Sequence, residues 1–170
     1  NKFQALKNAK KIISKTKCDA VKLEGGGKVI DVIKYLVKNK IRVQGHHGVL
    51  TKSKRDKFKV KGKKKAEHLK ILKDAQLLEN AGVFSIVLEC IKTSLAKNIT
   101  QELKIPTIGI GASSYCDGQV LVTDDLIGLN QINVRFVKKY SNITKQINSA
   151  IIRFKKDVKE KKFPLKKHSY

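Results

Sequence analysis

The chain contains no methionine, and it is poor in cysteine, proline and aromatic residues. Its three cysteines, Cys18, Cys90 and Cys116, show no CxxC spacing. Neither a disulfide framework nor a zinc site is therefore expected, and a reduced, cytoplasmic compartment fits best. No apolar run approaches the roughly 18 residues that a membrane span needs, and the first residues lack the apolar segment of a signal peptide. We therefore expect no membrane partner.

Acidic residues are also scarce, with 14 Asp and Glu against 38 Lys and Arg, and the net charge is +24. Such an excess ordinarily indicates a polyanionic partner. Only four of the basic residues are arginines, however, whereas base-edge recognition and bidentate phosphate recognition favour the guanidinium group. The lysines are spread over the whole chain, so we interpret the charge as compositional bias and expect no specific nucleic-acid partner. A basic α/β module that binds RNA or another polyanion remains the alternative.

The length and the hydrophobic content are those of a folded protein. A chain of 170 residues corresponds to one domain or to part of one, and a hydrophobic content of 41% is enough to build a core. Because the chain begins at Asn1 and has no methionine, we expect it to be part of a longer protein.

Helical and strand patterns alternate along the chain. Apolar residues at helical spacing predict helices over residues 3–13, 29–37, 69–81, 93–103 and 143–158. Short β-branched or alternating runs predict strands over residues 18–24, 41–45, 85–89, 107–111 and 119–123. Short apolar strands that alternate with helices are typical of a parallel sheet, so we predict an α/β fold.

The residues at the strand ends indicate which α/β fold to expect. No GxGxxG motif stands between a strand and a helix, as a dinucleotide site would require. Four of the five predicted strands end instead in residues suited to chemistry or to close approach of a ligand: Lys22 and Glu24, His46, Glu89, and Gly109 with Gly111. Because (β/α)₈ barrels build their active sites at these ends, we predict a (β/α)₈ TIM barrel. The predicted strands cannot close such a barrel, so we expect N-terminal strands 1 to 3 to be absent from this chain.

Lys22 and Glu24 lie two residues apart on a predicted strand and therefore share one face. They form either a salt bridge in a polar layer, or a ligand for a substrate carboxylate beside a metal ligand. His46 and His47 are neighbours on a strand and must face opposite ways, so only one can enter the site. The inward histidine is either a hydrogen-bond donor to the substrate or a satisfied structural histidine.

Glu89 closes the apolar run SIVLE, where a carboxylate is costly to bury without a partner. Such a residue suits a general base, and the alternative is a solvated acid at the start of a loop. No base is evident beside Cys90, so we interpret it as a small buried residue rather than a nucleophile.

Seven strings occur in an order that resembles the ketopantoate hydroxymethyltransferase family from its fourth barrel strand to its C-terminus. They are VKLEGG (residues 21–26), QGHHG (44–48), FKVKGK (58–63), VLEC (87–90), IPTIGIGA (105–112), CDGQVLV (116–122) and the closing FP and HSY. The resemblance covers essentially the whole chain. It implies that residues 1–170 form the C-terminal part of a single barrel domain, with strands 4 to 8 and the C-terminal helices. The long basic segment of residues 51–65 then follows strand five, and we expect it to shape or cover the mouth of the barrel.

The resemblance implies a magnesium-dependent enzyme that moves a hydroxymethyl group from 5,10-methylenetetrahydrofolate to 3-methyl-2-oxobutanoate, giving 2-dehydropantoate in the first step of pantothenate synthesis. It further implies that Glu24 helps to hold Mg²⁺, that Lys22 binds the carboxylate of the 2-oxo acid and that His46 contacts the substrate. Glu89 would be the proton acceptor. The family assembles as a homodecamer, and we expect the same here. Aspartates on the family's strands two and three complete its site, so this chain alone is expected to be inactive. A decayed barrel without activity is a further alternative.

Overall fold

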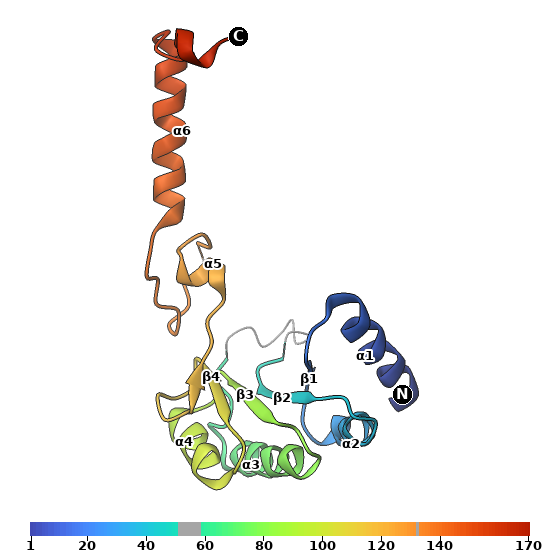
Figure 1. Ribbon diagram of the computed structural model, residues 1–170. Helices are drawn as coiled ribbons and strands as arrows, with labels where there is room; N and C mark the ends of the chain where they lie inside the picture. The colour runs from blue at the N-terminus through green and yellow to red at the C-terminus, as the bar shows by residue number, and fades with distance from the viewer. Residues whose placement is uncertain (51–58, 132) are drawn as a thin grey trace. The chain divides into compact units, whose positions relative to one another are not determined.

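The computed structural model describes residues 1–50, 59–131 and 133–170 (Figure 1). The chain divides into two compact units, Asn1–Val120 and Leu121–Tyr170. Most of the basic segment, residues 51–58, lies outside the described residues.

The first unit is built around a five-stranded parallel sheet in which the strands follow one another in chain order. These strands are β1 (Val21–Glu24), β2 (Val43–Gly48), β3 (Ser85–Glu89), β4 (Thr107–Ile110) and β5 (Gly118–Gln119). The helices of this unit are α1 (Lys2–Thr16), α2 (Ile30–Lys38), α3 (Lys65–Asn80) and α4 (Thr93–Glu102), with a short 3-10 turn, η1 (Gly27–Val29), before α2. Helices α2, α3 and α4 each connect two successive strands, whereas a loop without a helix joins β4 to β5.

The three connecting helices cover the same face of the sheet (Figure 1). The core between them and the sheet contains fully buried side chains from both layers, namely Ile33, Leu36, Leu78, Ile86, Leu88, Leu95 and Ile99. A doubly wound sheet has helices on both faces, whereas a (β/α)₈ barrel has all of them on the outside of sequentially ordered strands. The predicted fold class, an α/β fold built as part of a (β/α)₈ barrel, is confirmed. The numbering of these strands as 4 to 8 of the barrel stays a prediction.

Two strands differ in length from the predictions. β2 continues to Gly48 instead of ending at residue 45, because its pairing with β3 extends as far as Gly48 and Glu89. His46 and His47 therefore lie inside β2 rather than just beyond the predicted end of the strand. β5 stops at Gln119 instead of residue 123, because only Gly118 and Gln119 pair with β4.

Helix α3 buries Ala75 and Leu78 as its apolar spacing predicted, but the N-terminal end of the predicted stripe is exposed. The prediction placed Leu69 on the buried stripe, but this side chain is 56% exposed. The buried residues of the helix are Ile71, Asp74, Ala75 and Leu78. An aspartate thus occupies a core position, and it contributes to the geometry of the site.

The second unit contains α5 (Thr123–Leu126), α6 (Ile143–Lys159) and a 3-10 turn, η2 (Lys166–His168). The predicted helix over residues 143–158 is confirmed, and it begins where the side chain of Asn142 accepts a hydrogen bond from the backbone N–H of Lys145. Its predicted apolar residues, Ile147, Ile151 and Phe154, remain exposed within this unit. None of the helices in the described parts of the chain is long and apolar enough to cross a membrane.

Candidate active site

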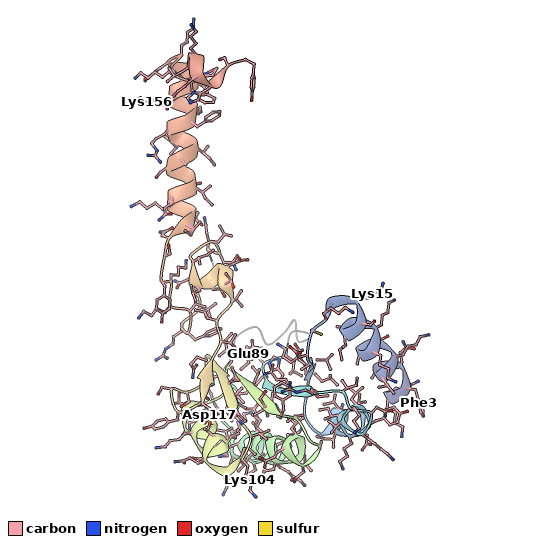
Figure 2. All side chains as sticks on the ribbon, viewed as in Figure 1. Phe3, Lys15, Glu89, Lys104, Asp117 and Lys156 are labelled. Atoms are coloured by element: carbon pink, nitrogen blue, oxygen red, sulfur yellow. The ribbon has the colours of Figure 1, made fainter. Side chains whose placement is uncertain are left out.

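Polar side chains from three neighbouring strands lie on the face of the sheet that the helices do not cover. In the strand register, Glu24 pairs with His46, and Gly48 pairs with Glu89. Side chains alternate along each strand, so Glu24, His46 and Glu89 point to one face, while Leu23 and Leu88 point to the helices. Figure 2 shows Glu89 on the side of the sheet opposite α3. The C-terminal ends of β1, β2 and β3 therefore bring together three of the predicted site residues.

His46 lies between the two carboxylates. Its Nε2 atom is 3.1 Å from Oε2 of Glu89, and its Nδ1 atom is 3.7 Å from Oε1 of Glu24. The ring is 1% exposed, whereas the side chains of Glu24 and Glu89 are 22% and 19% exposed. The first contact is poorly aligned and the second is too long, so neither ring nitrogen has a hydrogen-bond partner among the described residues. Buried polar atoms are nearly always satisfied in native proteins, so this ring is suited to receive a partner at the site.

Lys22 occupies the same strand face as Glu24, two residues earlier, and it is exposed. Among the ion pairs of the described residues there is none between Lys22 and Glu24. The alternative that these two residues form a structural salt bridge is therefore not supported. The role of Lys22 in binding a substrate carboxylate stays a prediction.

The described residues fit part of a magnesium site. No group of three or more His, Cys, Asp or Glu residues among them is arranged to hold a metal ion. Mg²⁺ commonly takes one or two protein carboxylates and completes its shell with water and substrate oxygens. The partly exposed carboxylate of Glu24 at a strand end fits one such ligand, and it does not make a complete site alone.

Two further polar residues on this face escaped the sequence reasoning. Gln44 precedes His46 by two residues, and its amide Nε2 donates a 2.9 Å hydrogen bond to the hydroxyl of Ser85 on β3. Ser85 is buried. Both residues lie within predicted strands, and the alternation of side chains places them on the same face as His46. They form a polar layer beneath the three site residues.

The backbone around Glu89 is closely packed against the end of β2. Gly48 has a φ of 113°, and an added Cβ would overlap the carbonyl oxygen of Glu89. The N–H of Val49 donates a 3.0 Å hydrogen bond to this same carbonyl. The end of β2 therefore fixes the backbone position of Glu89 at the end of β3.

Cys90 follows Glu89 and is 2% exposed. Burial, with a smaller contribution from the charge of Glu89, raises the pKa of its thiol to about 11. A thiol with such a pKa carries almost no thiolate at neutral pH. The prediction that Cys90 is a small buried residue is confirmed, and the raised pKa of its thiol agrees with the prediction that it is not a nucleophile.

The last part of the basic segment is held against the loop after β3. The N–H of Lys61 donates to the carbonyl of Cys90 at 2.8 Å, and the N–H of Lys92 donates to the carbonyl of Lys61 at 2.9 Å. These bonds form an isolated parallel bridge between Lys61 and Ile91. Lys61 therefore lies beside the loop that directly follows Glu89.

His47 points to the opposite face from His46, as predicted for neighbours on a strand. Its Nε2 atom lies 3.1 Å from Oδ2 of Asp74 on α3. Only one of the two histidines enters the site.

Comparison with known proteins identifies the family. The family description "Ketopantoate hydroxymethyltransferase" matches residues 1–166 of the chain. The chain belongs to this family. A 3-methyl-2-oxobutanoate hydroxymethyltransferase of Pelagibacter ubique (strain HTCC1062) is 69% identical over 170 residues, which cover 100% of this chain and 66% of that protein. Proteins of the same name from Chlorobium phaeobacteroides (strain DSM 266 / SMG 266 / 2430) and Clostridium botulinum (strain 657 / Type Ba4) are 45% and 44% identical, with 98% and 99% of this chain covered.

The chain spans only part of these ketopantoate hydroxymethyltransferases, namely 66%, 61% and 62% of their lengths. The resemblance that the sequence strings indicated is confirmed by the family match over residues 1–166.

Proposed function

We propose that the full-length protein containing this chain transfers a hydroxymethyl group from 5,10-methylenetetrahydrofolate to 3-methyl-2-oxobutanoate and produces 2-dehydropantoate. The observation that carries this proposal is the buried ring of His46, placed between Glu24 and Glu89 at adjacent strand ends. Active sites of (β/α)₈ barrels are built at this end of the strands. Membership of the family supports the reaction class.

Glu89 is proposed as the general base. Its carboxylate would take the proton from C3 of the 2-oxo acid, and the electron pair of the broken C–H bond would pass into the carbonyl group to give an enolate. The enolate carbon would then form a bond to the methylene carbon of the folate. Water would supply the hydroxyl group, and both bonds from that carbon to the folate nitrogens would break, so that tetrahydrofolate leaves with the protons from water and from C3. Because 19% of the Glu89 side chain is exposed, a substrate can reach it from the open face of the sheet.

His46 and Lys22 are proposed to bind the substrate. The buried ring nitrogens of His46 have no partner among the described residues and can donate to a substrate oxygen. The ammonium group of Lys22, on the same strand face as Glu24, is suited to pair with the carboxylate of the 2-oxo acid. Binding at both ends would fix the C3 atom of the substrate near Glu89.

Glu24 is proposed as one ligand of Mg²⁺. When bound, the ion would supply Lewis-acid polarisation of the 2-oxo group. The remaining roles also follow the family resemblance: we propose a homodecamer that acts in the cytoplasm, in the first step of pantothenate synthesis. We further propose that the protein binds neither a membrane nor a specific nucleic acid.

The test is the formation of 2-dehydropantoate by the full-length protein with Mg²⁺ and both substrates. We expect Glu89→Gln to lower the rate by about 10²–10⁴-fold, as removal of a general base does. Glu102→Gln on α4 is the matched control, because Glu102 is exposed and its side chain accepts a hydrogen bond from Gln76, away from the site. This variant should retain the activity of the unchanged protein.

A second measurement isolates the step assigned to Glu89. Exchange of the C3 hydrogen of 3-methyl-2-oxobutanoate with D₂O needs a base but no folate, so Glu89→Gln should lose it as well. A folded protein that neither exchanges this hydrogen nor forms 2-dehydropantoate would favour the alternatives, a decayed barrel or a polyanion-binding module.

A further inference from the structure

On the helix side of the sheet, a buried carboxylate connects the two strands that carry Glu24 and His46. Asp74, on α3, is 6% exposed. Its Oδ1 atom accepts a 3.2 Å hydrogen bond from the N–H of Gly27, and its Oδ2 atom lies 3.1 Å from Nε2 of His47 and 3.2 Å from Nζ of Lys70. A buried carboxylate is tolerated only when it is paired in this way. One side chain therefore contacts the loop after β1 and the end of β2.

The loop of residues 25–27 fits against this carboxylate because it is made of glycine. A Cβ added to Gly26 would overlap the side chain of Asp74. On the other side of the loop, the N–H of Gly25 donates a 2.9 Å hydrogen bond to the carbonyl of His46. The residue that precedes this loop is Glu24. Its position is thus tied to β2 by the backbone and to α3 through Asp74.

His47 is neutral in this arrangement. Its Nδ1 atom accepts a 2.7 Å hydrogen bond from the N–H of Gly48, so its proton is on Nε2, which donates to Asp74. Burial lowers the pKa of His47 and outweighs the attraction of Asp74. Burial opposes ionisation of Asp74, but the hydrogen bonds from His47 and Lys70 outweigh it and lower the pKa of that carboxyl. A neutral donor and an ionised acceptor form a strong hydrogen bond at neutral pH.

We propose that His47 and Asp74 are positioning residues for the site on the opposite face of the sheet. Their hydrogen bond fixes the end of β2 to α3, and the bond from Gly27 fixes the end of β1 to the same carboxylate. These two hydrogen bonds, on the helix side of the sheet, set the separation of Glu24 and His46 on the opposite side. The inference rests on the proposed function only for the roles of Glu24 and His46. The two residues touch neither substrate nor metal.

The expected consequence concerns the metal ligand. Loss of the His47 donor leaves Asp74 with Gly27 and Lys70, and Lys70 is an exposed side chain. The loop after Glu24 then samples more conformations. Groups that orient a metal ligand typically contribute about 10–100-fold in metal affinity, and since this contribution passes through the backbone we expect the lower end, about tenfold.

The test uses Mn²⁺ as the probe, since it prefers the same oxygen ligands as Mg²⁺ and its free fraction is measured by electron paramagnetic resonance. In the full-length protein, His47→Leu should weaken Mn²⁺ binding about tenfold. His47→Gln should restore most of the affinity, because the glutamine amide places an N–H donor near the position of Nε2. His68→Leu, on the same helix as Asp74 but outside this network, should bind Mn²⁺ as the unchanged protein does.

Two outcomes of the Mn²⁺ measurement would overturn the proposal. One is that His47→Leu lowers the midpoint of thermal unfolding while the Mn²⁺ affinity stays unchanged. His47 would then have a structural role alone. The other is that His47→Gln binds no better than His47→Leu.

Hydrogen exchange of the peptide that contains residues 25–27 separates this inference from the proposed function, since it needs neither metal nor activity. Faster exchange in His47→Leu, reversed in His47→Gln, supports the inference even if the protein forms no 2-dehydropantoate. Equal exchange in all variants would overturn it even in an active enzyme.

Discussion

The Nε2 atom of His46 lies 3.1 Å from Oε2 of Glu89, on a neighbouring strand. The strand register explains this proximity, because His46 pairs with Val87 and Glu89 follows two residues later on the same face. A buried imidazole is thereby placed against the carboxylate proposed as the base. Its ring nitrogens lack aligned partners among the described residues, so they contribute no hydrogen bond to stability there. We conclude that its position serves the site more than the fold.

Replacement of His46 tests this conclusion. His46→Leu keeps much of the side-chain volume and removes both ring nitrogens. We expect kcat to fall about 10²-fold, as a misplaced substrate or base commonly causes. The free energy of unfolding should change little, because the replaced ring nitrogens make no aligned hydrogen bond within the described residues. Steady-state kinetics and urea unfolding measure the two quantities; an unchanged kcat with a large loss of stability would contradict the prediction.

The glycine loop after β1 provides a pair of adjacent variants. A Cβ at Gly26 would overlap the Asp74 side chain, whereas a Cβ at Gly27 would meet Oδ1 of Asp74 at 3.5 Å, an ordinary contact. Gly26→Ala should therefore lower the free energy of unfolding by about 1–3 kcal/mol. Gly27→Ala should change it by less than about 0.5 kcal/mol. Urea unfolding of both variants checks the difference, and equal losses would mean that Asp74 does not occupy this position.

The convergence of Glu24, His46 and Glu89 could be predicted from the sequence. Each lies at or next to the end of a predicted strand, and the C-terminal ends of parallel strands meet at one edge of a sheet. Alternation then requires that only one of His46 and His47 enters the site. Local patterns were sufficient here because the strand period is short and regular.

The contact between His47 and Asp74 could not be predicted in this way. It depends on how α3 is rotated about its axis, and the packing of Ile71 and Leu78 against the sheet sets this rotation. The apolar spacing indicated a stripe through Leu69, which the structure leaves exposed. The end of β5 was predicted wrongly for a related reason. The length of a strand depends on its pairing with the neighbouring strand, and the apolar residues 120–122 continue beyond the residues of β5 that pair with β4.

The buried His47 predicts a pH dependence of stability. Its pKa in the folded chain lies below the ordinary 6.5 because of burial. Between these two values the unfolded chain binds a proton that the folded chain does not, so stability falls as the pH falls below about 6.5. The slope from this group is at most about 1.4 kcal/mol per pH unit.

Urea unfolding at several pH values between about 7.5 and 5.5 covers the range in which this loss of stability begins. The unchanged protein should lose more unfolding free energy over this range than His47→Leu, which lacks the titrating group. His68→Leu should follow the unchanged protein. Parallel curves for all three proteins would contradict the assignment of the loss to His47.

Asp117, labelled in Figure 2, stabilises the start of β4 from the loop before β5. Its Oδ2 atom accepts hydrogen bonds from the backbone N–H of Thr107 at 2.8 Å and from the Thr107 hydroxyl at 3.0 Å. The backbone hydrogen bond is the main cause that lowers the pKa of Asp117, so its contribution to stability is present above pH 3.8 and is lost as the pH falls through the lower folded value.

Asp117→Asn should reduce the free energy of unfolding at neutral pH by about 0.5–1 kcal/mol, a modest value because the carboxylate is exposed and screened by solvent. The difference from the unchanged protein should shrink in acid, once Asp117 is protonated in the folded chain. Asp19→Asn is the matched control, since Asp19 is exposed and lies away from β4 in the sequence. Urea unfolding at neutral pH and in acid measures both effects. If the loss of unfolding free energy stayed constant with pH, the shape of the Asp117 side chain, rather than its charge, would account for its effect on the N–H of Thr107.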